Sequence, residues 1–285
     1  MRYEAPETVD AAIELLRGGG DTIKILAGGT DLLVQLRTDM ISPDVVVDIK
    51  KIDETREIMT EGGGYRIGAA VTAAELNEHE GLKAAWPGLV EAAWLIGSTQ
   101  IMGRASLGGN LCNGSPAADS VPAMIAAGAI AAVAGPNGRR DVPVEDIVIG
   151  PRKLSLTEGE FVVSFLLPER PARASDAYQR FIPRTEMDIA VVGVGISLVL
   201  DPDGTITDAR VGLGAVAEKP QKVDDAADAL IGSKLDEAAL DKLDAAIQAA
   251  CRPINDKRGT IEFRTKVAGV VARRVAESAY ERAGV

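Results

Sequence analysis

Residues 25–32 read Ile25-Leu26-Ala27-Gly28-Gly29-Thr30-Asp31-Leu32, an apolar strand that opens through two glycines into the polar start of a helix. Glycines let such a turn adopt positive φ and approach a ligand closely. Unpaired backbone N–H groups at a turn of this kind attract phosphate oxygens. A tight turn that binds nothing explains the same residues, so this stretch alone leaves both interpretations open.

The sequence around this turn predicts a small α/β unit. Residues 8–17 have the apolar spacing of an amphipathic helix, and residues 22–27 and 45–49 have the composition of buried strands. A further helix is expected to start at Thr30. We therefore expect the first domain to span residues 1–55.

A second glycine-rich segment, residues 97–120, is polar among apolar neighbours. It contains Ser106-Leu107-Gly108-Gly109-Asn110-Leu111, followed by Ser115-Pro116 and Asp119. We expect residues 107–116 to form a loop. Hydroxyl, amide and backbone donors beside small side chains suit an extended diphosphate and ribityl chain. A structural Ω-loop is the alternative interpretation.

The middle of the chain, residues 56–174, predicts a second domain of mixed strands and helices. Residues 57–69 have the pattern of a hairpin around a glycine-rich turn, and Thr72 with Glu75 forms a capping box for the next helix. Further elements are expected as helices over residues 91–97 and 118–127 and a strand over residues 160–167.

The last part of the chain, residues 175–285, predicts an α+β domain. Strands over residues 189–200 and 205–216 flank Asp201-Pro202-Asp203-Gly204, which predicts a hairpin. Helices with charges on one face follow over residues 235–250 and 260–283.

Composition excludes several classes of protein. The chain has 285 residues, 46% of them hydrophobic, and its 31 Lys and Arg against 42 Asp and Glu give a formal charge of −11. A nucleic acid would be repelled, so we expect no nucleic-acid partner. The most apolar stretches, residues 123–134 and 190–200, are shorter than the roughly 18 residues that cross a bilayer. With no signal-peptide pattern at its start, we expect a cytoplasmic protein without a transmembrane segment.

Metal and acid–base chemistry have few candidate residues. Cys112 and Cys251 are far apart in sequence and lack the spacing of a zinc or iron–sulfur site. His79, the only histidine, lies in an acidic stretch that predicts a surface helix rather than a catalytic triad. We predict no catalytic residue and no metal ligand.

A dinucleotide-binding pattern can also be drawn at residues 212–217, Gly212-Leu213-Gly214-Ala215-Val216-Ala217. That fingerprint requires a helix to begin at the glycines, but Pro220 follows within one turn and no βαβ unit is completed. The stretch is better interpreted as the second strand of the C-terminal hairpin.

Taken together, the two glycine-rich segments resemble the FAD-binding medium subunit of molybdenum hydroxylases, the relatives of xanthine dehydrogenase and carbon monoxide dehydrogenase. The similarity covers most of the chain and includes residues 69–76, Arg180 with Asp188-Ile189-Ala190, and residues 256–264. The sequence departs from the family pattern at Met102-Gly103, where relatives often carry Arg-Asn. The consequence of that difference stays open.

The resemblance implies an α+β chain: a vanillyl-alcohol-oxidase or PCMH-type FAD-binding fold of two α/β subdomains, then a C-terminal α+β domain with an antiparallel sheet and helices. It implies an arginine, Arg180, near the flavin, where a fixed cation stabilises the reduced ring. The implied FAD-binding residues are Leu26, Ala27, Gly28, Gly29, Thr30, Asp31, Leu32, Leu33, Gly97, Ser106, Gly108, Gly109, Asn110, Asp119, Val162, Arg180 and Ile189.

The resemblance also implies a function. The chain would be the electron-transfer subunit of a heterotrimeric molybdenum hydroxylase, taking electrons from [2Fe-2S] clusters on a small subunit and passing them to an external acceptor. A large subunit would carry the molybdopterin cofactor, and two heterotrimers would form a dimer. Two alternatives are a free-standing FAD-dependent oxidoreductase and a scaffold that only binds partner chains. The organic substrate and the electron acceptor stay open.

Overall fold

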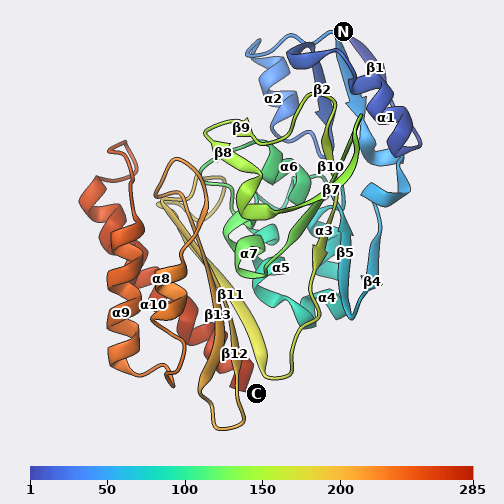
Figure 1. Ribbon diagram of the computed structural model, residues 1–285. Coiled ribbons are helices and arrows are strands. Elements are labelled where there is room, and N and C mark those ends of the chain that lie inside the picture. The colour runs from blue at the N-terminus through green and yellow to red at the C-terminus, as the bar shows by residue number, and fades with distance from the viewer. Residues whose placement is uncertain (285) are drawn as a thin grey trace.

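The computed structural model describes residues 1–284, which contain three main sheets that follow one another along the chain (Figure 1). Three hydrophobic clusters form the core, one centred on each sheet, and the cluster of the first sheet also includes Ala134, Phe161 and Val163 from the second. The chain passes from the first sheet to the second between Asp48 and Ile58, and from the second to the third between Leu167 and Ala174. The α+β fold class expected from the sequence is therefore confirmed, while the domain limits at residues 55 and 174 stay a prediction.

The N-terminal unit is a parallel sheet with helices. Its elements are β1 (Arg2–Glu4), α1 (Val9–Leu16), β2 (Ile23–Leu26), α2 (Leu32–Arg37) and β3 (Val45–Asp48). The strands lie in the order β1-β3-β2, and β3 is parallel to both neighbours. The carboxyl ends of all three strands therefore lie at one edge of the sheet, where ligands bind in many open α/β folds.

The middle unit is an antiparallel sheet with its helices. Its elements are β4 (Ile58–Glu61), β5 (Gly64–Gly68), α3 (Ala73–Glu78), α4 (Glu80–Ala85), α5 (Pro87–Trp94), α6 (Leu107–Cys112), α7 (Ser120–Ala126), β6 (Ile130–Gly135), β7 (Gly138–Pro143), β8 (Val148–Gly150), β9 (Lys153–Leu154) and β10 (Phe161–Leu167). The five-stranded sheet has the order β4-β5-β10-β6-β7. The predicted hairpin is confirmed by the pairing of Glu61 with Gly64, and the capping box of Thr72 and Glu75 is present.

One local prediction in this unit is wrong. Residues 107–116 were expected to be loop, but residues 107–112 form helix α6. The Ser106 hydroxyl caps the helix by accepting from the N–H of Gly109, and Leu107 and Leu111 are buried in the core. Capping and burial outweigh the poor helix propensity of two adjacent glycines.

The C-terminal unit is an antiparallel sheet between two layers of helices. Its elements are β11 (Ala174–Phe181), β12 (Val192–Leu200), β13 (Ile206–Gly214), β14 (Gln221–Lys222), α8 (Asp224–Asp228), α9 (Glu237–Ala250) and α10 (Ile261–Gly284). Helix α10 packs on β11 and β12, with α9 beside it, while α5 and α7 of the middle unit contact the same sheet (Figure 1). The sheet therefore connects the C-terminal helices to the middle unit.

Two sequence predictions concern this sheet. The hairpin of β12 and β13 is confirmed, although β12 begins at Val192 and leaves Ile189 in the preceding segment. Residues 212–214 lie in β13 and pair antiparallel with β12, and Gly212 and Leu213 also pair antiparallel with β14. The rejection of a dinucleotide fingerprint at residues 212–217 is thus confirmed.

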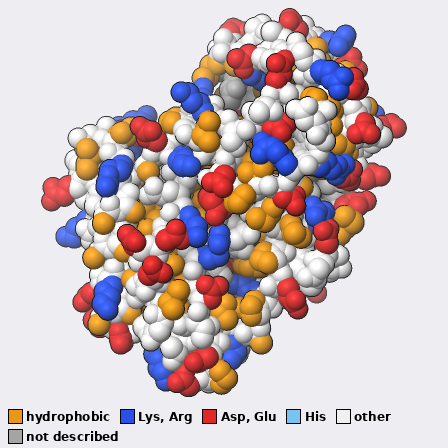
Figure 2. Space-filling model, viewed as in Figure 1, with side chains coloured by type: hydrophobic (Ala, Val, Ile, Leu, Met, Phe, Trp, Pro, Cys, Tyr) orange, Lys and Arg blue, Asp and Glu red, His pale blue; other side chains and the backbone are white. Residues whose placement is uncertain are grey.

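The surface carries mixed charge. On the face drawn in Figure 2, acidic and basic side chains are interspersed with small hydrophobic areas rather than gathered by sign. Within residues 1–284, no helix combines the length and apolar character that crossing a membrane requires.

Candidate functional site

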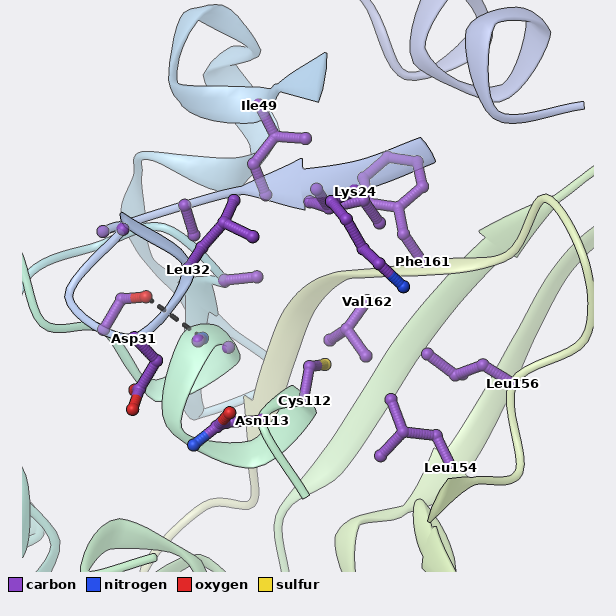
Figure 3. A pocket seen from close by; sticks show the side chains of 18 of the residues that line it. Lys24, Asp31, Leu32, Ile49, Cys112, Asn113, Leu154, Leu156, Phe161 and Val162 are labelled. Atoms are coloured by element: carbon purple, nitrogen blue, oxygen red, sulfur yellow. Dashed lines mark hydrogen bonds between the residues drawn. The ribbon is translucent and has the colours of Figure 1, made fainter. Parts of the chain in front are cut away.

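A cavity of about 700 Å³ lies between the N-terminal unit and the middle unit. It is lined by the turn from β2 to α2, by α6 and by the chain from Arg152 into β10 (Figure 3). Its volume is in the range of small-molecule sites, about 300–1,000 Å³. Among the predicted cofactor-binding residues, the lining includes Ala27, Gly28, Gly29, Thr30, Asp31, Leu32, Ser106, Gly108, Gly109, Asn110 and Val162.

The turn after β2 presents unused backbone donors. Gly29 has a φ of +80°, which an L side chain rarely adopts. The first turn of helix α2 contains two backbone hydrogen bonds. The N–H of Leu33 donates to the carbonyl of Gly29, and the N–H of Gln35 donates to the carbonyl of Asp31. In the described part of the chain, the N–H groups of residues 28–31 donate to no protein acceptor. They are available to a ligand with several acceptor oxygens.

Helix α6 contributes another part of the cavity wall. A Cβ atom at Gly109 would meet only the Ser106 hydroxyl, at 3.2 Å. A side chain at this position would require only a small shift of that hydroxyl, which caps α6. Asn110 accepts the N–H of Ser120 at 3.0 Å and its hydroxyl at 2.7 Å through Oδ1, so its amide Nδ2 keeps both donors for a ligand.

The two glycine-rich segments contact one another. A Cβ atom at Gly28 would collide with the carbonyl oxygen of Arg104, in the chain that leads into α6. At the other ends of the two short helices, Gln35 donates to Asn113 at 3.4 Å. The turn after β2 and helix α6 thus lie side by side in the wall of the cavity.

Charged groups lie around the rim. Lys24 and Arg152 line the cavity and supply positive charge. Burial raises the pKa of Asp31, and the nearby Arg152 opposes that rise. Glu160 also lines the cavity, and its hydrogen bonds from Arg140 lower its pKa to about 2, so that it stays ionised.

Six predicted residues lie outside this cavity. Leu26 and Leu33 border a smaller hollow of about 320 Å³ behind the β2–α2 turn. Gly97 has a φ of +69° and accepts the N–H of Met187 at 3.3 Å. Ile189 is 53% exposed. The other two residues, Asp119 and Arg180, lie together.

Asp119 and Arg180 form a buried ion pair. Arg180 Nη1 donates to Asp119 Oδ2 at 2.6 Å, and the Tyr178 hydroxyl donates to Oδ1 at 3.2 Å. Burial raises the pKa of Asp119 to about 6, although Arg180 and Tyr178 oppose the rise. Arg180 is therefore a buried cation paired within the protein, not a free surface charge.

Sequence reasoning missed much of the cavity wall. Arg152, Leu154, Leu156 and Phe161 line it, as does Cys112. The apolar members look like ordinary core residues in a sequence, because burial against a ligand and burial against protein select the same side chains. A positive φ at Arg152 carries no sequence signal either.

His79 caps a helix, and both cysteines are protonated thiols. His79 Nδ1 accepts the N–H of Leu82 at 3.0 Å and so caps helix α4. Burial raises the pKa of Cys112 to about 12 and that of Cys251 to about 11, so both stay protonated thiols.

Two family models together match almost the whole chain. Residues 1–170 match the FAD binding domain in molybdopterin dehydrogenase, and residues 176–279 match the CO dehydrogenase flavoprotein C-terminal domain. The chain is 34% identical over 281 residues to the carbon monoxide dehydrogenase medium chain of Afipia carboxidovorans, covering 99% of this chain and 97% of that one. It is 31% identical over 284 residues to the xanthine dehydrogenase FAD-binding subunit of Escherichia coli O157:H7, covering 99% and 97%.

Solved structures show the same fold. A chain of the reconstituted CO dehydrogenase from Oligotropha carboxidovorans superimposes with a TM-score of 0.94 at 33% identity, covering 99% of this chain and 98% of that one. A chain of quinoline 2-oxidoreductase from Pseudomonas putida 86 gives 0.90 at 26% identity, covering 100% and 98%.

Proposed function

Because the chain belongs to the FAD-binding medium subunits of the molybdenum hydroxylase family, we propose that its cavity holds FAD and that the β2–α2 turn and helix α6 bind the diphosphate together. The observation that carries this proposal is the contact between the two segments at Gly28 and Arg104. The chain is an oxidoreductase flavoprotein subunit whose role is electron transfer.

The cavity fits the cofactor in two respects. The unused N–H groups of residues 28–31 match a diphosphate, which has acceptor oxygens and no donor. Gly109 lines the cavity, and a Cβ atom there would meet the Ser106 hydroxyl at 3.2 Å and begin to fill the space next to the backbone. A glycine at this position lets a ligand approach the backbone closely.

The chain's own residues bind and orient the cofactor. When bound, FAD supplies the capacity to accept and release electrons. Residues 26–33 and 106–110 would hold the diphosphate and ribityl parts, with Lys24 and Arg152 near the negative charge. The apolar side chains of Leu154, Leu156 and Phe161 would exclude water from this part of the cavity. We propose that Gly97, Asp119, Val162, Arg180 and Ile189 also contribute to the FAD site, as the family resemblance implies.

The complex contains further subunits. Relatives of this chain are medium chains of multi-subunit dehydrogenases. We propose a small partner with [2Fe-2S] clusters, a large partner with molybdopterin, a dimer of these heterotrimers, and a cytoplasmic location. In the described residues no three His, Cys, Asp or Glu side chains cluster as a metal site, so the clusters would come from the small partner.

The test is to purify the chain with the subunits that accompany it and to identify released cofactors by absorption and subunits by mass. We expect FAD in equimolar amount with this chain and two co-purifying partners. A colourless preparation would favour a scaffold, and steady substrate turnover by the isolated chain would favour a free-standing oxidoreductase.

A further inference from the structure

Lys50 forms a hydrogen bond to the backbone of the β2–α2 turn. Its Nζ donates to the carbonyl oxygen of Ala27 at 2.8 Å and to Asp48 Oδ1 at 2.7 Å. The Tyr3 hydroxyl donates to the other oxygen of Asp48 at 2.6 Å. The network therefore joins the carboxyl ends of β1, β3 and β2, which lie at the same edge of the sheet.

The ion pair of Lys50 and Asp48 in this network is largely shielded from solvent. The side chains of Lys50 and Asp48 are 21% and 9% exposed. Burial alone would raise the pKa of Asp48, but the hydrogen bonds from Lys50 and Tyr3 lower it below the usual value. Asp48 therefore stays ionised and keeps the ammonium group of Lys50 beside the turn.

The bond to Ala27 sets the direction of the next N–H. No peptide bond in the described chain is cis, so the N–H of Gly28 points away from the carbonyl of Ala27. Lys50 borders two smaller hollows, one of which is also lined by Gly28, Gly29 and Thr30, and it is not part of the cavity wall. Fixing the carbonyl on the side of Lys50 turns the free N–H of Gly28 away from Lys50, and Gly28 is one of the residues that line the cavity.

We propose that Lys50 is a positioning residue for FAD: it holds the Ala27 carbonyl away from the cavity so that the Gly28 N–H is oriented to bind the diphosphate. Without this bond the peptide can turn, and its carbonyl oxygen would then face the anion and repel it. The inference rests on the proposed function, because it requires a diphosphate in the cavity. Lys50 touches the turn and not the cofactor.

The experiment compares Lys50→Met with Lys51→Met in the full chain freed of FAD. Methionine keeps the apolar stem and removes the donor, whereas Lys51 is exposed and makes no side-chain hydrogen bond within residues 1–284. We expect Lys50→Met to weaken FAD binding about tenfold or more, the scale of a charge-assisted hydrogen bond, and Lys51→Met to leave it unchanged. Lys50→Arg, which keeps a donor, should restore most of the affinity.

Two further measurements separate positioning from general stabilisation. Lys50→Met should weaken binding of ADP far more than that of adenosine, and the ³¹P resonances of bound ADP should shift. In the unaltered chain, the Gly28 amide resonance should move on adding ADP and stay in place with adenosine, a result that does not depend on whether the variant folds.

The outcomes are distinguishable. Two results would overturn the role of Lys50 while the proposed function stands. In the first, the unaltered chain binds FAD but its Gly28 amide resonance does not move on adding ADP. In the second, Lys50→Met binds FAD as tightly as Lys51→Met. If the unaltered chain binds neither FAD nor ADP, the proposed function fails and this inference fails with it.

Discussion

The backbone of Gly28 lies against the carbonyl oxygen of Arg104, so closely that a Cβ atom at residue 28 would collide with that oxygen. This contact joins a turn at the edge of the N-terminal sheet to the segment that enters helix α6 in the middle unit. The two sets of backbone groups proposed to bind one diphosphate are therefore held together by the protein alone.

Gly28→Ala should separate the two segments. The added methyl group collides with backbone rather than with a flexible side chain, so we expect a loss of about 1–3 kcal/mol in the free energy of unfolding and a lower FAD content. Gly103→Ala is the matched control, because a Cβ atom there meets nothing within 4 Å. Urea unfolding and flavin absorption measure both effects. Equal flavin content in the two variants would contradict the role of the contact.

Gly109→Asp should abolish FAD binding while leaving the fold intact. A Cβ atom at residue 109 meets the Ser106 hydroxyl at 3.2 Å, and a carboxylate carried on it would extend from the cavity wall and repel the diphosphate. Gly103→Asp adds the same charge outside the cavity and should retain FAD. The free energy of unfolding of the FAD-free protein should change by under about 1 kcal/mol in both variants. Full flavin content in Gly109→Asp would remove α6 from the site.

Arg180→Ala should destabilise the chain strongly. It leaves the buried carboxylate of Asp119 without its cation, which typically costs about 3–5 kcal/mol. Changing Asp119 to Ala as well removes the unpaired charge, so the double variant should lose less than the sum of the two single variants. Denaturant unfolding of the four proteins gives the coupling energy. Strict additivity would show that the pair contributes nothing.

The ion pair of Arg140 and Glu160 should make stability depend on acid pH. Hydrogen bonds from Arg140 lower the pKa of Glu160 from 4.5 to about 2 in the folded chain, so the folded state favours the ionised form. Its contribution is present above pH 4.5 and is lost as the pH falls toward 2. Glu160→Gln should be less stable than the unaltered chain at pH 6, with the difference narrowing below pH 4. A constant difference across this range would contradict the shift.

Local signals in the sequence predicted much of the fold. The apolar spacing of residues 8–17 and the capping box at Thr72 depend on neighbouring residues, and the structure contains both. Helix α6 could not be predicted in this way, because its glycine-rich sequence has poor intrinsic helix propensity. Its formation depends on the Ser106 cap and on the burial of Leu107 and Leu111.

The candidate site also has parts that the sequence could predict and parts that it could not. Glycines can mark positions where the backbone approaches a ligand, and the turn at Gly28 and the segment at Gly109, both predicted from sequence, line the cavity. The role inferred for Lys50 could not, because its bond to Ala27 depends on the order of strands in the sheet.

Amide hydrogen exchange of the chain with and without FAD tests the central claim most directly, because the N–H groups of residues 28–31 donate to no acceptor in the described protein. We predict that peptides covering residues 26–33 and peptides covering residues 106–113 both gain protection when FAD binds. Protection of one segment without the other, or of neither, would contradict the claim that they bind one diphosphate together.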